Sequence, residues 1–228
     1  MNDIAKKTWT RTLDDRVGIS HEELERKSKV PASALPVEEP LLADRIEHIF
    51  ERPESQKLPE GNQWGFKMEV PELLYNRGEI HNLSIQRGTL TPEDRYKINE
   101  HIVQTIKMLE NLPFPKHLRT VPELAGGHHE KMDGTGYPKR LTRDEMSPVA
   151  RMMAVADIFE ALTAVDRPYK KGKMLSEAIK IMSFMVKDQH IDPEIFRLFL
   201  ESKTYLIYAK AYMNSDQIDD VQISDYLT

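Results

Sequence analysis

The chain has 228 residues, which suits one domain or one domain with an added arm, and its 32 basic and 37 acidic side chains give a net charge of −5. This mild acidity argues against binding nucleic acid polymers through bulk charge, although a local basic patch could still hold a small phosphorylated ligand. The absence of cysteine excludes disulfides, a thiol nucleophile and a cysteine-based zinc site, and it fits a cytoplasmic protein.

The first 80 residues predict an irregular arm with short helices rather than an independent domain. Ser20, followed three residues later by Glu23, has the pattern of a capping box that begins a short helix. Three prolines then interrupt regular helix: Pro31, Pro36 and Pro40. Residues 41–50 predict a second short helix, and the alternation of polar and apolar residues over 82–86 predicts a short strand.

From Thr91 onward the sequence predicts helices. Thr91 is placed as a cap with proline at the first helical position, and isoleucines then recur at helical spacing. Further helices are predicted to begin at three places: Ser147–Pro148, Leu175 and Asp192–Pro193. The sequence therefore predicts an all-α fold, with a helical domain over residues 81–205 and an acidic C-terminal tail over residues 206–228. The apolar run at residues 148–165 contains three charged residues, so no membrane span is expected.

Three of the eight histidines have unusual positions. His128 and His129 are adjacent, and on a helix their side chains would diverge by roughly 100°. Two neighbouring metal ions, about 3.5–4 Å apart, would then suit them better than one. The alternative is a pair of ordinary helix histidines, one buried and one solvated. His101 is predicted to lie on the apolar stripe of the 92–110 helix, one position before Ile102, where it could be a hydrogen-bonded core residue or a metal ligand.

Asp157 stands in a helical segment, residues 152–159, that is otherwise apolar. We therefore expect its carboxylate to be buried, and a buried carboxylate must be paired, protonated or bound to a metal. A structural salt bridge with Arg151 or Arg167 is the alternative to a metal-binding role.

Two further segments suggest ligand contacts. The glycines of residues 133–138 permit close backbone approach, so this loop could shape the mouth of a site, or it could be an ordinary turn. Arg167 and Lys170 could hold phosphate oxygens, or they could belong to a solvated basic cluster.

Residues 128–138, with the sequence HHEKMDGTGYP, resemble the HHExxDGxGYP signature of the HD-GYP family. Residues 154–170 and 87–110 are similar to the blocks that flank the signature in that family. The resemblance implies a helical HD-domain fold. It also implies hydrolysis of the bacterial messenger cyclic di-GMP at a centre of two or three divalent metal ions, most often iron or manganese.

The resemblance also implies roles for single residues. It assigns metal binding to four positions: His101, His128, His129 and Asp157. It implies catalytic roles for Glu130 and Asp133. It implies substrate contacts at five positions: Gly136, Tyr137, Pro138, Arg167 and Lys170.

The sequence departs from the family in one respect. The His-Asp dipeptide that gives the family its name is absent, as are the ligands that accompany it. The chain resembles the C-terminal half of a large HD-GYP protein, with residues 1–80 like an insert between the two halves. We therefore expect an incomplete HD-like bundle, with a partly bare apolar face on the 148–164 helix. We also expect little hydrolysis by this chain alone, and recovery when an upstream HD segment is supplied.

Two other functions stay open at this point. The chain could be a non-catalytic module that binds cyclic di-GMP or a signalling protein, or it could be a hydrolase for a different nucleotide.

Overall fold

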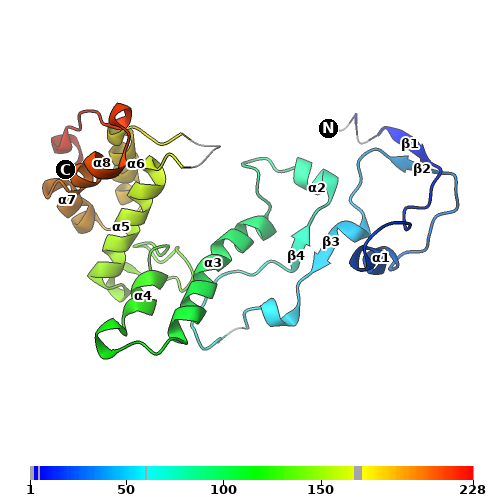
Figure 1. Ribbon diagram of the computed structural model, residues 1–228, viewed down its shortest axis with the longest axis horizontal. Helices are drawn as coiled ribbons and strands as arrows, with labels where there is room; N and C mark the ends of the chain where they lie inside the picture. Colours follow the sequence, from blue (N-terminus) through cyan, green and yellow to red (C-terminus); the bar gives the residue numbers. More distant parts are fainter. Residues whose placement is uncertain (1–2, 5, 60, 167–170, 228) are drawn as a thin grey trace. The chain divides into compact units, whose positions relative to one another are not determined.

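The computed structural model describes residues 3–4, 6–59, 61–166 and 171–227 (Figure 1). The chain divides into two compact units. Unit 1 comprises residues 1–59 and 69–100, and unit 2 comprises residues 60–68 and 101–228. The boundary falls within a long helix, whereas the sequence suggested a division near residue 80.

The predicted all-α class is confirmed, because the strands among the described residues form only two small antiparallel pairs. The helices are α1 (His21–Lys27), α2 (Glu79–Leu83), α3 (Pro92–Glu110), α4 (Val121–Gly126), α5 (Pro148–Thr163), α6 (Leu175–Lys187), α7 (Pro193–Glu201) and α8 (Thr204–Tyr212). The strands are β1 (Thr8–Arg11), β2 (Val37–Pro40), β3 (Ile49–Glu51) and β4 (Leu73–Asn76). Strand β1 pairs with β2, with Thr8 opposite Pro40, and β3 pairs with β4, with Phe50 opposite Tyr75.

Charged side chains connect the elements of unit 1. Glu39 accepts hydrogen bonds from Arg11 at 2.8 Å and from Arg45 at 2.7 Å. Lys27, only 8% exposed, donates to the carboxylate of Asp15 at 3.0 Å. A buried charge is tolerated only when it is paired in this way.

The sequence predicts only some of the short elements of unit 1 correctly. Helix α1 is confirmed, and the Ser20 side chain accepts from the Glu23 amide as a cap. The helix predicted over residues 41–50 is wrong, since this stretch holds only the single 3₁₀ turn Ile46–His48 before β3 begins. The strand predicted over residues 82–86 is also wrong, because the chain there completes α2.

A residue far away in the sequence explains why α2 forms where a strand was predicted. Asp44 accepts hydrogen bonds from the amides of Ile80 at 2.9 Å and His81 at 3.1 Å, and so caps the start of α2 from 36 residues away. No local pattern reveals such a cap.

Helix α3 begins as predicted. The Thr91 hydroxyl accepts from the Asp94 amide at 3.1 Å, and the Asp94 carboxylate accepts from the Thr91 amide at 3.2 Å. The apolar stripe is confirmed at Ile102 and Ile106, which are 0% and 2% exposed, whereas Ile98 is 55% exposed. The apolar packing of this helix is thus concentrated in its C-terminal half.

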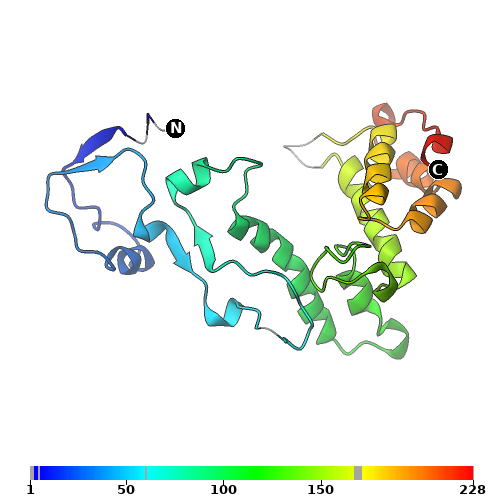
Figure 2. The same ribbon diagram turned by 180° about the vertical axis from the view of Figure 1, so that it is seen from behind.

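The apolar core of unit 2 is built by α5, α6, α7 and α8, which lie together in both ribbon views (Figures 1 and 2). The predicted caps are confirmed: Ser147 accepts from the Ala150 amide, and Asp192 accepts from the amides of Glu194 and Ile195. The buried core residues are Val155, Phe159, Leu175, Ala178, Ile179, Met182, Ile191, Phe196, Leu200, Tyr205 and Ala209.

The segment expected to be an acidic tail belongs to this core. It contains most of α8, and its later apolar residues pack against the buried cluster: Ile218, Val221, Ile223, Tyr226 and Leu227. Gln217, 6% exposed, donates to the carbonyls of Thr163 and Lys173, both at 3.0 Å. The acidic composition therefore describes only the outward side chains of this segment.

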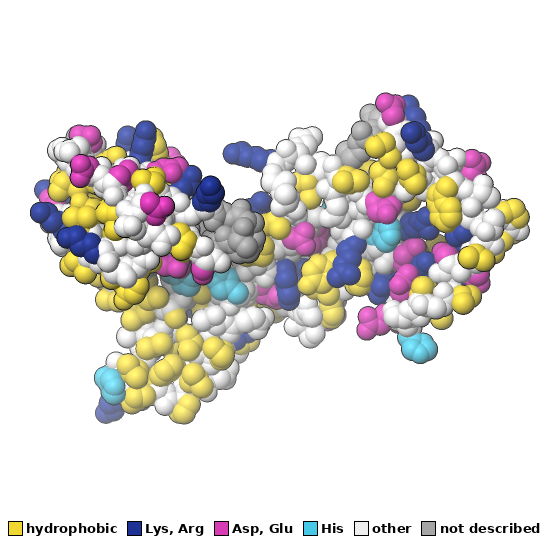
Figure 3. All heavy atoms as spheres, turned by 45° about the horizontal axis from the view of Figure 1, so that its top comes forward, with side chains coloured by type: hydrophobic (Ala, Val, Ile, Leu, Met, Phe, Trp, Pro, Cys, Tyr) yellow, Lys and Arg dark blue, Asp and Glu magenta, His cyan; other side chains and the backbone are white. Residues whose placement is uncertain are grey.

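Apolar atoms remain on the surface (Figure 3). On α5, the side chains of Val149, Met152 and Met153 are 49%, 41% and 40% exposed, as expected for a partly bare face. A groove of about 400 Å³ runs between α5 and α7 and is lined by Met152, Val155, Ala156, Ile195, Leu198 and Phe199. Among the described residues, no helix combines the length and the apolar composition needed to cross a bilayer.

Candidate metal centre

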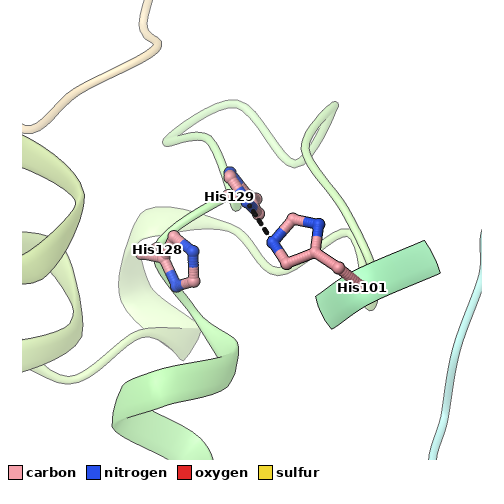
Figure 4. A group of neighbouring side chains, drawn as sticks. All are labelled: His101, His128 and His129. Atoms are coloured by element: carbon pink, nitrogen blue, oxygen red, sulfur yellow. Dashed lines mark hydrogen bonds between the residues drawn. The ribbon is translucent and has the colours of Figure 1, made fainter. Parts of the chain in front are cut away.

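Three histidines converge in unit 2 (Figure 4). His101 lies on α3, and His128 and His129 follow the end of α4. One ring nitrogen from each histidine lies within 4.8 Å of the other two. The Nε2 atoms of His101 and His129 are 3.1 Å apart. Helix α3 and the segment that follows α4 thus bring this part of the predicted metal site together.

The histidine pair is not helical, which changes its geometry. Helix α4 ends at Gly126, and the rings of His128 and His129 lie with their centroids 4.1 Å apart. The roughly 100° divergence expected from a helix therefore does not apply. Both imidazoles can face one point, so a single ion can be shared.

Two glycines before the pair allow close packing. A Cβ added to Gly126 would lie 2.8 Å from Ile106 of α3, and one added to Gly127 would lie 3.1 Å from Ala150 of α5. Only small residues fit there, so the end of α4 approaches both helices closely. The adjacent Gly-Gly dipeptide is a sequence signal of this close approach, and it was not among the predicted site features.

The tautomer of His128 suits a metal ligand. Its Nδ1 lies 2.8 Å from the Ala125 carbonyl oxygen, which can only accept, so Nδ1 carries the proton. The lone pair is then on Nε2. A ring N–H that donates to a backbone carbonyl is the usual support of a ligating histidine.

His129 is held as a neutral imidazole. Burial, with contributions from the neighbouring His128, His101 and His190, lowers the pKa of His129 to about 4. At neutral pH its lone pair is therefore available. The Tyr137 ring stacks on it with centroids 4.7 Å apart, and burial raises the pKa of Tyr137 to about 12, with a contribution from Asp157. The three converging imidazoles form a donor set that fits a divalent transition metal.

The signature loop folds back so that the residues that follow it bind Glu130, directly after the histidine pair. Glu130 is 1% exposed, and its carboxylate accepts from the amides of Lys139 at 2.7 Å and Leu141 at 2.9 Å. Burial raises the pKa of Glu130, and the backbone hydrogen bonds oppose this rise. A Cβ on Gly136 would lie 2.4 Å from the Lys131 nitrogen, so only glycine fits this position.

Asp133 has a different environment from Glu130. It is exposed and accepts from the amide and hydroxyl of Thr135, which lower the pKa of Asp133. Within the described part of the chain, neither Glu130 nor Asp133 belongs to the group of potential ligand atoms formed by the histidines. The catalytic roles implied for these two carboxylates stay predictions.

The expectation that Asp157 is buried is wrong. Asp157 is exposed on α5, and it lies outside the group of converging ligand atoms among the described residues. Helix α5 buries Ala154, Val155 and Phe159, and it also carries apolar residues on its outer face. Because this helix is apolar almost throughout, its sequence does not indicate which face points inward. Asp157 is still close enough to Tyr137 to affect that side chain's pKa.

Arg151, one of the two suggested salt-bridge partners of Asp157, forms its ion pair with a different carboxylate. It pairs with the fully buried Asp192, which also accepts from Arg143 at 2.8 Å. Asp192 thereby connects α5 and α7. Arg167 and Lys170 lie outside the described residues, so their predicted phosphate contacts stay predictions.

His190 was not predicted as a site residue from the sequence. It lies in the connection between α6 and α7, and it is close enough to His129 to affect its pKa. Burial is the main cause that lowers the pKa of His190 itself. It belongs neither to the signature nor to the blocks that flank it, and only the fold brings it near the histidine pair.

Comparisons with known proteins show which family the chain resembles. An HD domain family model matches residues 36–195. A cyclic di-GMP phosphodiesterase of Pseudomonas aeruginosa is 36% identical over 136 residues, which cover 60% of this chain and 30% of the relative. The 3'3'-cGAMP-specific phosphodiesterase 3 of Vibrio cholerae is 39% identical over 128 residues, 54% of this chain and 26% of the relative. A cyclic di-GMP phosphodiesterase of Thermotoga maritima is 33% identical over 131 residues, 56% of this chain and 35% of the relative.

The chain spans about a third or less of the length of these relatives. The family match includes all three histidines and the whole signature loop. It covers well over half of this chain. The chain therefore belongs to the HD domain family, and its HHExxDGxGYP signature assigns it to the HD-GYP group within that family.

Proposed function

We propose that this chain contributes a histidine cluster to a metal-dependent phosphodiesterase site for cyclic dinucleotides, with cyclic di-GMP as the substrate. The convergence of His101, His128 and His129 is the observation that carries the proposal. The names of the relatives support the substrate class, since they refer to cyclic di-GMP or 3'3'-cGAMP. Both molecules are cyclic dinucleotides joined by phosphodiester bonds.

The three imidazoles would hold a divalent ion. Iron suits imidazole ligands, and manganese suits a site that carboxylate or water oxygens complete. A bound ion supplies Lewis-acid polarisation of a phosphoryl oxygen. Three nitrogen ligands fill about half of an octahedral coordination sphere, so a centre of two or three ions needs ligands from outside the cluster. Asp157 is one candidate, and a segment that contains the His-Asp pair is another.

The chain's own residues have distinct proposed tasks toward the substrate. Tyr137 is half-buried beside His129 and keeps its hydroxyl proton at neutral pH, so it can donate a hydrogen bond to a phosphate oxygen. Gly136 and Pro138 are buried, and the Pro138 carbonyl accepts from the Lys67 amide at 2.8 Å, so these two residues support the loop. Arg167 and Lys170 are proposed to hold the phosphates.

The first experiment measures metal binding. The purified chain is titrated with Mn²⁺, and we expect about one ion per chain, lost in His129→Ala. His117→Ala is the matched control, because His117 is exposed and lies outside the cluster among the described residues. Failure of the unmodified chain to bind Mn²⁺ or Fe²⁺ would contradict the proposal.

The second experiment measures turnover. We expect little hydrolysis of cyclic di-GMP by the chain alone, and recovery when an HD-containing segment is supplied separately. A preference for 3'3'-cGAMP in the same assay would change the assigned substrate but keep the reaction class.

A non-catalytic cyclic di-GMP-binding module is the second candidate. The exposed Asp157 and the small number of ligand atoms that converge among the described residues favour it. Tight binding of cyclic di-GMP without turnover, even after an HD-containing segment is added, would select this function. The cysteine-free composition supports a cytoplasmic location for either candidate.

A further inference from the structure

Glu130 uses both of its carboxylate oxygens inside the protein. Oε1 accepts from the Lys139 amide at 2.7 Å and Oε2 accepts from the Leu141 amide at 2.9 Å, and the residue is 1% exposed. A buried carboxylate is costly unless it is hydrogen-bonded, so these bonds hold both the side chain and the returning end of the loop. The Glu130 carboxylate thus joins the start of the loop to its end.

The loop closed by Glu130 packs directly on His129. The Tyr137 amide donates to the His129 carbonyl at 3.2 Å, and the two rings stack at 4.7 Å with an angle of 20°. The backbone at Gly136 lies so close to Glu130 that an added Cβ would be 2.5 Å from the Glu130 Cα. The position of Tyr137 therefore depends on how the loop returns to residues 129 and 130.

We infer that Glu130 is a positioning residue of the proposed metal centre. It holds residues 131–141 so that Tyr137 fixes the orientation of the His129 imidazole toward His101. The inference rests on the proposed function, and it replaces the catalytic role that the family resemblance implied for Glu130. A catalytic carboxylate needs an oxygen that faces the reacting atoms, whereas each oxygen of Glu130 faces a backbone N–H of its own loop.

The test compares Glu130→Gln with Glu123→Gln. The amide in E130Q places an NH₂ donor opposite a backbone N–H, so at least one of the two bonds is lost. Glu123 is an exposed carboxylate on the neighbouring helix α4, which makes E123Q a control of the same chemistry. Hydrogen–deuterium exchange of residues 137–141 reports the loop, and Mn²⁺ titration reports the imidazoles.

In E130Q we expect faster exchange at the Lys139 and Leu141 amides, and Mn²⁺ affinity weaker by about 10- to 100-fold, as for other residues that support a metal ligand. The number of ions bound should stay unchanged, and E123Q should match the unmodified chain. Tyr137→Ala should weaken Mn²⁺ binding while the two amides stay protected. If E130Q does not fold, Glu130→Asp, which shortens the reach by one methylene, gives the same readouts.

Unchanged amide protection or unchanged Mn²⁺ affinity in E130Q would overturn the inference. If the unmodified chain binds no Mn²⁺, the proposed function fails, and slow exchange retained in E130Q would still reject the loop contact itself. The two failures are therefore distinguishable.

Discussion

The two units differ in how many apolar side chains they bury. In the described part of unit 1, Tyr96 is the one buried hydrophobic residue, and the other buried side chains are polar or charged: Arg11, Lys27, Arg52, Thr91, Glu93 and Glu100. In unit 2, eleven buried residues from α5 to α8 form one apolar cluster. Apolar burial stabilises a fold without directional partners, whereas a buried charge is tolerated only with a specific partner. Unit 1 is therefore stabilised mainly by individual polar contacts, and unit 2 mainly by the apolar surface area that its helices bury.

The histidine cluster belongs to the unit with the apolar core. His101 directly precedes the buried Ile102 on α3, and the histidine pair follows glycines packed against α3 and α5. A site that must hold ligand atoms within fractions of an ångström needs rigid supporting elements. The contrast between the units can be tested by changes that affect one and not the other.

The largest effect is expected from Phe159→Ala in the core of unit 2. Phe159 is 2% exposed and packs edge-on against Phe199 at 5.0 Å and Tyr208 at 5.4 Å. Its removal should lower the stability of α5–α8 by about 3–5 kcal/mol, measured by denaturant-dependent hydrogen exchange. Phe184→Ala, at a residue 51% exposed, should change stability by less than about 0.5 kcal/mol. Equal effects of the two substitutions would contradict the assigned core.

The second prediction concerns the charged contact inside unit 2. Burial raises the pKa of Asp192, but hydrogen bonds from Arg151 and Arg143 and from backbone amides outweigh it, so the net pKa is lowered. A lowered folded-state pKa gives stability that is present above the unfolded-state pKa and is lost as the pH falls through the folded-state value. Asp192→Asn should therefore cost about 1.5–3 kcal/mol at pH 7 and progressively less below about pH 4.

The pH dependence separates this contact from general acid destabilisation. Asp188→Asn, at an exposed position in the same connection, is the control. A loss of stability in Asp192→Asn that does not change between about pH 7 and pH 3 would show that the carboxylate charge is not involved.

The sequence predicted the features that depend on neighbours in the chain. The caps at Thr91, Ser147 and Asp192 were found because a cap and the amide it serves lie within three residues. The cap that Asp44 makes on α2 was not found because it joins residues 36 apart. The pairing of β1 with β2 also joins residues far apart in the sequence, since Thr8 lies opposite Pro40.

The candidate site shows the same division. The signature identified His128 and His129, and α3 was predicted well enough to include His101. The burial of Asp157 was predicted wrongly because α5 is apolar on both its inner and its outer face. The support from Glu130 depends on backbone amides nine and eleven residues away, which no helix or strand pattern fixes.

The third prediction tests whether the site loop depends on close packing as the rest of unit 2 does. Gly136→Ala would place a methyl group 2.4 Å from the Lys131 nitrogen, so the loop backbone must shift. We expect a cost of about 1–3 kcal/mol and weaker Mn²⁺ binding. Gly134→Ala is the control and should disturb the packing less, because its added Cβ would lie 3.2 Å from the Thr142 side chain. The φ of +76° at Gly134 adds some backbone strain in this variant. Full Mn²⁺ affinity in Gly136→Ala would show that the histidines are positioned without the loop.

The smallest effect is expected in unit 1, from Lys27→Met. Methionine keeps most of the apolar stem but removes Nζ, which donates to the carbonyl and the carboxylate of Asp15, both at 3.0 Å. We expect a loss of about 1 kcal/mol in the local stability of unit 1, because the Asp15 carboxylate stays partly solvated and tolerates the loss of its partner. The difference should shrink in about 1 M NaCl, where the screening length falls to about 3 Å. Lys29→Met removes a pair with Glu51 whose side chains are 46% and 74% exposed, so its effect should be smaller still. Amide protection in α5–α8 should be the same in both variants, and a loss of protection there would mean that the two units do not depend on separate sets of contacts.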